Sequence, residues 1–301
     1  ELSMEKTLDV IVPLYNEKDC VEELLTRLFK LREDFKAESV DTRFIFVNDG
    51  SSDCSPEIVA NYAKDNDFVK LINFSRNFGH ELAVIAGLDY SKADYSAIID
   101  ADLQDPPELI KKMYSKIKEG YQVVYGQRNK RENESVFKKV TAYCFYRFMN
   151  ALSDTKLPND TGNFRLITAD VRNAILKVRE HRRFLRGIAV WVGFKSTPVY
   201  YDRVGRFAGE THYPLKAMFR LAFNAIFEMS TKPLYVISWG GLLLLLLSSI
   251  SLFMNKLLFG AVFFVGSLQL FAIAIVGAYI GRIYEETKNR PLYIVDNTIN
   301  L

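Results

Sequence analysis

Apolar runs of strand length alternate with amphipathic stretches along the first third of this sequence. The runs rich in branched side chains cover residues 8–14, 43–47 and 69–74. Helical patterns cover about residues 20–31, a segment capped by Ser55 with Pro56 as its first helical residue, and residues 80–90. Strands and helices in alternation predict an α/β fold with a mostly parallel sheet, whose ligands bind where the strands end.

A fourth apolar run, residues 96–99, leads into Asp100-Ala101-Asp102, and Pro106-Pro107 then stops the strand and can open a helix at Glu108. In extended backbone residues i and i+2 point the same way, so the two carboxylates are expected to converge. Converging carboxylates repel unless a cation separates them, and hard oxygen ligands suit Mg²⁺ or Mn²⁺ carrying a diphosphate. About one D-x-D is expected by chance in a chain of this length, so an ordinary solvated loop is the alternative.

A Rossmann dinucleotide-binding fold is the obvious competitor for this pattern. It would place G-x-G-x-x-G after the first strand, where this chain has Pro-Leu-Tyr-Asn-Glu at residues 13–17. A nucleotide remains plausible without that loop, because Asp49 can accept from a ribose or uracil edge and Tyr15 can lie against a base. Taken singly, each of these residues is also compatible with a turn or a helix cap.

Four motifs in order resemble glycosyltransferase family 2. They are Val-Pro-Leu-Tyr-Asn-Glu at 12–17, Val-Asn-Asp-Gly-Ser-Ser-Asp at 47–53, Arg-Asn-Phe-Gly at 76–79 and Asp-Ala-Asp-Leu-Gln-Asp-Pro-Pro-Glu at 100–108. Within that family the chain is most similar to the polyisoprenyl-phosphate glycosyltransferases, relatives of dolichyl-phosphate mannose synthase and of bactoprenol glucosyltransferases. The resemblance covers nearly the whole chain and implies a GT-A nucleotide-sugar-binding domain over residues 1–213.

The same resemblance assigns site residues. Nucleotide-binding positions are matched by Pro13, Tyr15, Glu17, Val47 and Asp49. The metal and diphosphate site is matched by Asp100, Ala101, Asp102 and Gln104. Of these, Asp100, Asp102 and Gln104 are expected to bind the metal ion, and Asp102 is also expected to be a catalytic residue. Arg128 matches an arginine near the donor phosphates, although a surface ion pair would explain it equally well.

Two positions depart from the family pattern. Arg206 and residues 209–213 resemble the loop R-x-x-G-x-[ST]-K-Y, which closes over pyrophosphate and lipid phosphate, but His212 replaces its lysine and would hold phosphate less firmly. Asn163 stands where a block reading G-D-F-R-L has aspartate, with Asp160 nearby as a substitute or a turn residue. If aspartate there orients the acceptor, the present chain would be a weakened variant or an engineered mutant, and Asn163→Asp should raise turnover by about 10²- to 10⁴-fold. If the acceptor needs no such help, the substitution should change turnover little.

Two uncharged stretches, residues 233–254 and 260–281, follow the soluble part of the chain. As helices each would be roughly 33 Å long against a hydrocarbon core of roughly 30 Å, so we expect a two-helix transmembrane hairpin over residues 233–284, with buried core helices as the alternative. More Lys and Arg flank the hairpin than occupy its turn, which predicts an inner-membrane protein with its catalytic domain, both termini and a tail over residues 285–301 in the cytoplasm.

Further stretches are candidates for the membrane interface. In residues 214–232 a polar side chain recurs every fourth position from Lys216 to Glu228, as in an amphipathic juxtamembrane helix or a buried bundle helix. Residues 136–152 mix aromatic and basic side chains and fit either an interfacial helix or packing against the domain. A net charge of +3 argues against nucleic acid and suits an anionic membrane surface.

The implied reaction is inverting transfer of a sugar from a UDP-sugar, with glucose expected, to polyprenyl phosphate, which would supply O-antigen modification or protein glycosylation. A GDP-mannose donor, or an impaired variant or scaffold of the same family, is the alternative. A processive polysaccharide synthase would need a longer membrane region and a Q-x-x-R-W block that the chain lacks. The resemblance and the apolar hairpin also imply a homo-oligomer such as a tetramer.

Overall fold

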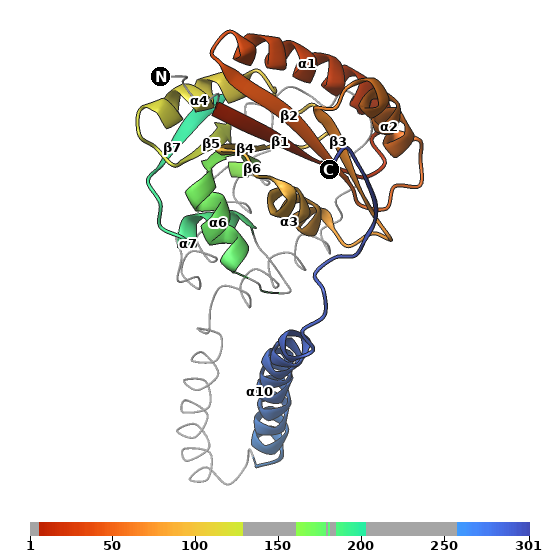
Figure 1. Cartoon of the computed structure of the whole chain (residues 1–301). Coiled ribbons are helices and arrows are strands. Elements are labelled where there is room, and N and C mark those ends of the chain that lie inside the picture. The colour runs from red at the N-terminus through yellow and green to blue at the C-terminus, as the bar shows by residue number, and fades with distance from the viewer. Residues whose placement is uncertain (1–5, 129–160, 179, 181–184, 203–257) are drawn as a thin grey trace.

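The computed structural model describes residues 6–128, 161–178, 180, 185–202 and 258–301. Within these residues the chain forms an eight-stranded sheet in the order β7-β5-β6-β4-β1-β2-β3-β8 (Figure 1). The strands are β1 (Lys6–Leu14), β2 (Val40–Asn48), β3 (Val69–Phe74), β4 (Tyr95–Ile98), β5 (Val123–Arg128), β6 (Thr161–Thr168), β7 (Ser196–Tyr201) and β8 (Val295–Ile299). The helices are α1 (Lys18–Lys36), α2 (Ser55–Asp65), α3 (His80–Tyr90), α4 (Leu109–Lys118), α6 (Ala169–Lys177), α7 (Leu185–Trp191) and α10 (Leu258–Thr287).

The centre of the sheet is parallel, as the sequence predicts. β1 pairs in parallel with β2 and with β4, and β2 pairs in parallel with β3. β6 runs antiparallel between β4 and β5, and β8 runs antiparallel on β3. Because β6 is reversed, it begins at the edge where β4 and β5 end, so its first residues join the ligand-binding edge of the sheet.

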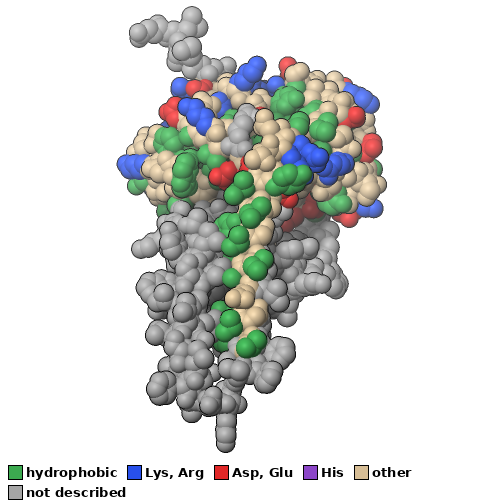
Figure 2. Space-filling view, turned by 90° about the horizontal axis from the view of Figure 1, so that it is seen from below, with side chains coloured by type: hydrophobic (Ala, Val, Ile, Leu, Met, Phe, Trp, Pro, Cys, Tyr) green, Lys and Arg blue, Asp and Glu red, His purple; other side chains and the backbone are tan. Residues whose placement is uncertain are grey.

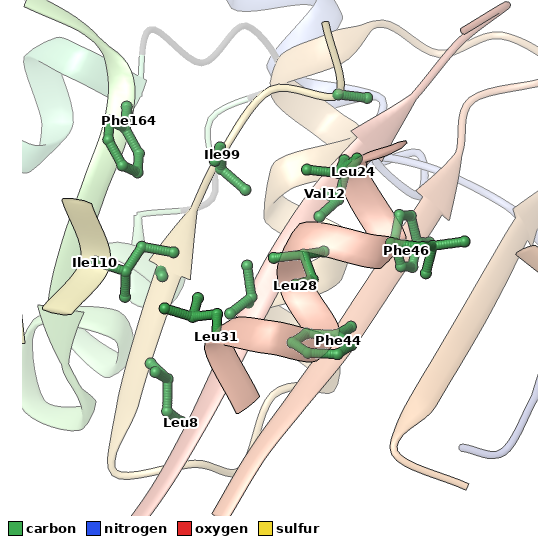
Figure 3. Packing of buried hydrophobic residues seen from close by; sticks show 14 of the residues in the cluster. Leu8, Val12, Leu24, Leu28, Leu31, Phe44, Phe46, Ile99, Ile110 and Phe164 are labelled. Atoms are coloured by element: carbon green, nitrogen blue, oxygen red, sulfur yellow. The ribbon is translucent and has the colours of Figure 1, made fainter. Parts of the chain in front are cut away.

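Helices cover both faces of the sheet, which explains why its central strands read as continuous apolar runs. Figure 1 shows α1, α2 and α4 on one face and α3, α6 and α7 on the other. Figure 3 shows the first face, where Leu24 and Leu28 of α1 lie over Val12 of β1 and Phe44 and Phe46 of β2, all fully buried. Alternate strand residues such as Ile11 and Ile45 belong to the core of the second face.

One predicted cap is wrong. The expected Ser55 is already the first residue of α2, whose N-cap position is Cys54. The Ser55 hydroxyl donates instead to Asp53 at 2.5 Å and accepts from the backbone N–H of Glu17 at 2.9 Å. This serine therefore joins the loop after β1 to the loop after β2, both of which border the candidate site.

The segment expected as a simple tail, residues 285–301, contributes to the sheet. α10 leaves the domain on the side of α3, α6 and α7, and the chain then returns to pair β8 with β3 (Figure 1). Tyr293 stacks on Phe74, and the side-chain amide of Asn300 donates to the carbonyls of Ala63 and Val69 at 2.7 and 2.9 Å. The segment after α10 is thus fixed to the catalytic domain at Tyr293, through β8 and at Asn300.

Much of the expected membrane region lies outside the described residues, including residues 136–152, 214–232 and the first span at 233–254. The second span, residues 260–281, falls within α10. Of the helices in the described part of the chain, none combines the length and apolarity required to cross a bilayer. The predicted hairpin is accordingly not shown by the structure.

Candidate functional site

The site residues predicted from separate motifs meet at one edge of the sheet. Tyr15 and Glu17 follow β1, Asp49 follows β2, and the Asp100 to Asp105 turn follows β4. Arg128 ends β5, and Asn163 lies near the start of the reversed β6. Pro13 and Val47 are paired, buried residues of β1 and β2, and Ala101 is also buried, whereas the Tyr15 ring is 50% exposed and available to a ligand.

The two carboxylates of the D-x-D motif do not lie on an extended strand. β4 ends at Ile98, and the following residues form a turn in which Leu103 has a left-handed φ of 58°. Asp100 accepts a hydrogen bond from Nε2 of His80 at 2.8 Å, and Asp102 accepts one from the backbone N–H of Gln104 at 3.1 Å. The alternation argument for converging side chains therefore does not apply, because it requires extended backbone at both residues.

The donor set of this turn nevertheless fits a hard divalent cation. No cluster of three or more His, Cys, Asp or Glu side chains suited to a metal ion occurs in the described residues. Gln104 supplies a different kind of ligand: its Oε1 is buried and has no hydrogen-bond partner within the described structure. Two carboxylates and an unsatisfied amide oxygen in one turn are the oxygen donors that Mg²⁺ and Mn²⁺ prefer.

His80 is a site residue that the sequence motifs did not single out. Burial acts to lower the pKa of His80, but the hydrogen bond and charge of Asp100 and the charge of Glu81 outweigh it, so the pKa is raised. Burial likewise acts to raise the pKa of Asp100, and His80, Arg186 and Arg128 more than offset it. Asp100 is consequently ionised at neutral pH, as a metal ligand must be.

Asp49 organises the loop that contains the Arg-Asn-Phe-Gly motif. Its buried carboxylate accepts from the backbone N–H of Phe78 at 2.6 Å and from that of Gly79 at 2.9 Å, and the Asn77 side chain donates to its carbonyl at 3.1 Å. Burial raises the pKa of Asp49, although the two backbone N–H groups work against that rise. Two distant motifs are thus joined at the expected nucleotide edge.

Arg128 belongs to a second cluster beside the turn. Tyr201, at the end of β7, donates from its hydroxyl to the buried carboxylate of Asp105, and Arg128 donates to the Tyr201 oxygen at 3.4 Å. An Nη of Arg128 lies 3.8 Å from the same carboxylate. Burial and the neighbouring Asp105 raise the pKa of Tyr201, so it remains a neutral donor. This cluster fixes the far end of the D-x-D turn to β5 and β7.

Tyr201→Phe should lower the free energy of unfolding by about 1 to 3 kcal/mol, because it removes a donor from a buried carboxylate. Tyr200→Phe is the matched control, since Tyr200 lies next to Tyr201 on β7 but is 62% exposed. Denaturant unfolding of the three proteins measures the difference. Equal stabilities for the two variants would show that the Tyr201 hydroxyl does not support Asp105.

Asn163 lies in a polar cluster between β6, α3 and α7. It is 4% exposed; its Oδ1 accepts from Nε of Arg186 at 3.0 Å, and its Nδ2 faces Glu81 Oε1 at 3.4 Å. Arg165 donates to the Asn163 carbonyl at 3.1 Å, and complete burial lowers the pKa of Arg165 to about 10. The sequence motifs did not identify Arg186 or Arg165 as site residues. Their contacts with Asn163 depend on the fold and leave no signal in the local sequence.

The two remaining predicted site residues, Arg206 and His212, lie outside the described residues. Their assignment to a loop closing over phosphate stays a prediction. The described residues therefore define the strand-end part of the site: the exposed Tyr15 ring, the D-x-D turn, and the clusters around Arg128 and Asn163.

Residues 9–176 match the model of a family described as glycosyl transferase family 2. The chain is 42% identical to YkcC, an uncharacterized glycosyltransferase of Bacillus subtilis, over 97% of this chain and 94% of that protein. It is 34% identical to the bactoprenol glucosyl transferase of Shigella phage SfV, over 96% of this chain and 98% of that protein.

Among solved structures, the chain resembles glucosyl-3-phosphoglycerate synthase from Mycobacterium tuberculosis, determined with Mn²⁺, UDP-glucose and phosphoglyceric acid. The TM-score is 0.54 at 16% identity, over 74% of this chain and 78% of that one. At such identity the likeness concerns the fold alone. It agrees with the expected GT-A type of α/β fold.

Proposed function

The chain belongs to glycosyl transferase family 2, and from that premise we propose that it transfers a hexose from a UDP-sugar, with glucose as the favoured sugar, to polyprenyl phosphate. The observation that carries the proposal is the end-to-end similarity to bactoprenol glucosyl transferases at 34% identity. Similarity over 96% of the chain includes the segments after residue 213, among them the two uncharged stretches.

In the proposed reaction a phosphate oxygen of the acceptor attacks the anomeric carbon of the sugar. The bond from that carbon to the UDP oxygen breaks, so the products are polyprenyl-phosphate-sugar of inverted configuration and UDP. The acceptor is already an anion and needs little help from a base. The developing charge on UDP is the larger barrier, so electrostatic stabilisation of the diphosphate is the main catalytic requirement.

The residues at the strand ends have different proposed roles in binding the donor and stabilising the diphosphate. Tyr15 offers its ring to the base, and Asp49 holds the 75–79 loop at the nucleotide edge. Asp100, Asp102 and Gln104 would hold Mg²⁺ or Mn²⁺, which supplies positive charge to the donor diphosphate when bound. Asp105, Arg128 and Tyr201 keep the turn in place.

The proposal includes attachment to the cytoplasmic face of the inner membrane through the hairpin over residues 233–284. Hydrophobic side chains follow α10 along its length in Figure 2, and Val262, Phe264, Ile273 and Ile280 are each more than half exposed. Residues 260–281 contain no charged side chain. Lipid would cover such a surface, and a bilayer-bound homo-oligomer would keep the site near the acceptor headgroup.

A cysteine at Asn255 should react with a membrane-impermeant thiol reagent added outside intact cells. Asn255 lies outside the described residues, and its position between the two proposed spans would place it on the face opposite both termini. The native Cys54, which is exposed in the catalytic domain, is the internal control and should react only after lysis. Labelling of position 255 only after lysis would contradict the hairpin topology.

A panel of radiolabelled nucleotide sugars offered with undecaprenyl phosphate tests the proposed donor. We expect a labelled lipid product from UDP-glucose, and not from GDP-mannose. Lipid labelled from GDP-mannose would replace the donor and keep the reaction class, whereas no labelled lipid from any donor would favour an impaired variant or scaffold.

A further inference from the structure

The guanidinium group of Arg186 faces the site with only one of its three nitrogens hydrogen-bonded to the described part of the chain. It is half-buried on α7, and its Nε donates to Asn163 Oδ1 at 3.0 Å. Its two terminal nitrogens make no hydrogen bond or ion pair with the part of the chain that the structure describes. A guanidinium held through Nε alone leaves a pair of N–H donors, the arrangement that matches carboxylate and phosphate oxygens.

Asn163 orients this guanidinium group without neutralising it. The amide oxygen accepts from Arg186, while the amide nitrogen faces Oε1 of Glu81 and Nδ1 of His80, each at 3.4 Å. Glu81 in turn accepts from the backbone N–H of Leu185 at 3.3 Å, which ties the start of α7 to α3. An aspartate at position 163 would pair with the Arg186 charge, whereas the neutral amide orients the side chain and leaves its charge available.

A buried arginine next to Arg186 adds a second positive charge to this cluster. Arg165 donates to the backbone carbonyls of Asn163 and Gly162 at 3.1 and 3.2 Å, so its charge meets carbonyl dipoles there. With its pKa at about 10, Arg165 is still protonated at neutral pH. The charge of Arg186 disfavours the protonated form of Arg165, whereas the carboxylates of Glu81 and Asp100 favour it, with Glu81 having the larger effect.

The cluster lies away from the nucleotide side of the sheet. β4, which carries the D-x-D turn, separates β6 from β1 and β2, whose ends carry Tyr15 and Asp49. α7 covers the face of the sheet from which α10 departs (Figure 1). A ligand reaching Arg186 from that face would arrive from the side proposed to meet the membrane, across the turn from the nucleotide.

We propose that Arg186, positioned by Asn163, binds the phosphate monoester of the lipid acceptor. The proposal rests on the proposed function, because it takes the acceptor class from there. Arg186 would hold the phosphate through its terminal nitrogens and leave one oxygen free to attack. Asn163 then has a positioning role, which it exerts through Arg186 and not through its own contact with the acceptor.

Arg186→Ala should raise the KM for undecaprenyl phosphate roughly 10- to 100-fold, the usual effect of losing hydrogen bonds to a charged group. The KM for the UDP-sugar and the affinity for UDP should stay within about twofold, because the nucleotide contacts lie elsewhere. Lys177→Ala is the control, since it removes one exposed positive charge from the adjacent α6. Arg186→Lys, which keeps the charge but loses the paired N–H donors, should have an intermediate KM and guards against a folding defect in the alanine variant.

Asn163→Asp supplies an independent test of the positioning role. The family resemblance alone favours a gain in turnover; the geometry favours the opposite, because a carboxylate would compete with the acceptor phosphate for Arg186 and would face Glu81. We expect a KM for undecaprenyl phosphate at least roughly tenfold higher. A faster enzyme with unchanged acceptor KM would overturn the role assigned to Asn163.

Equilibrium binding of labelled undecaprenyl phosphate in detergent, without any nucleotide sugar, separates this inference from the proposed reaction. Arg186-dependent retention of the lipid supports the inference even if no sugar is transferred. Inorganic phosphate should compete only weakly, which would separate a lipid headgroup site from a site for free phosphate. Equal lipid binding by the wild type and Arg186→Ala, or a rise in the donor KM alone, would overturn the inference.

Discussion

Asp102→Asn should abolish Mn²⁺-dependent UDP binding while leaving the fold intact. The half-buried carboxylate accepts a hydrogen bond from the backbone N–H of Gln104, and an amide oxygen can still make that contact. The amide cannot supply the negative charge that a divalent cation and diphosphate require, so we expect UDP affinity in Mn²⁺ to fall at least roughly 100-fold. Calorimetric titration with UDP and Mn²⁺ measures this loss.

Asp34→Asn is the matched control for that titration. Asp34 of α1 forms an ion pair with Lys111 of α4 at 3.2 Å, on the face of the sheet that these helices cover, and its side chain is partly exposed. Its loss should leave UDP affinity unchanged. If Asp102→Asn also bound UDP and Mn²⁺ as the wild type does, the metal assignment to the D-x-D turn would be contradicted.

Gly50→Ala should unfold the nucleotide edge and lower the free energy of unfolding by roughly 2 to 5 kcal/mol. Gly50 has a φ of 70°, and an added Cβ would lie 2.6 Å from the Asn77 nitrogen and 2.7 Å from the Arg76 carbonyl carbon. Both contacts are with backbone, and the Asp49 carboxylate holds that loop through Phe78 and Gly79. Neither the loop after β2 nor the 75–79 loop can move away without breaking these hydrogen bonds. UDP affinity should therefore fall together with stability.

Gly120→Ala is the control that measures the loss of stability caused by a positive φ alone, without a steric clash. Gly120 has a φ of 90°, and nothing lies within 4 Å of an added Cβ. Thermal unfolding should show a small loss for Gly120→Ala and a several-fold larger loss for Gly50→Ala. Equal losses would mean that the 75–79 loop does not press against Gly50 as the structure has it.

Local sequence patterns were sufficient to predict the elements that carry the nucleotide edge. The strand at Val69–Phe74 and the helix at His80–Tyr90 have the predicted bounds, because period and turn residues are local signals. β8 was missed because Val295–Ile299 is short and polar in its middle, and it forms a strand only through pairing with the distant β3. Tertiary pairing of this kind leaves no periodic signal in the sequence.

The candidate site was predicted in its residue types more than in its geometry. Asp100 and Asp102 were correctly placed after a strand, but alternation along that strand could not foresee the turn that begins beyond Ile98. His80, Arg186 and Tyr201 enter the site through contacts between elements far apart in the sequence. Such contacts depend on the order of strands in the sheet, which motifs do not specify.

The central claim is metal-dependent transfer of a hexose to a lipid phosphate. The most direct measurement incubates the full chain in detergent or lipid with UDP-glucose, undecaprenyl phosphate and Mn²⁺, and identifies the products by mass spectrometry. We predict undecaprenyl-phosphate-hexose and UDP in equal amounts, and loss of both when a chelator removes the metal. Release of free glucose without a glycosylated lipid, or transfer that is unaffected by the chelator, would contradict the account.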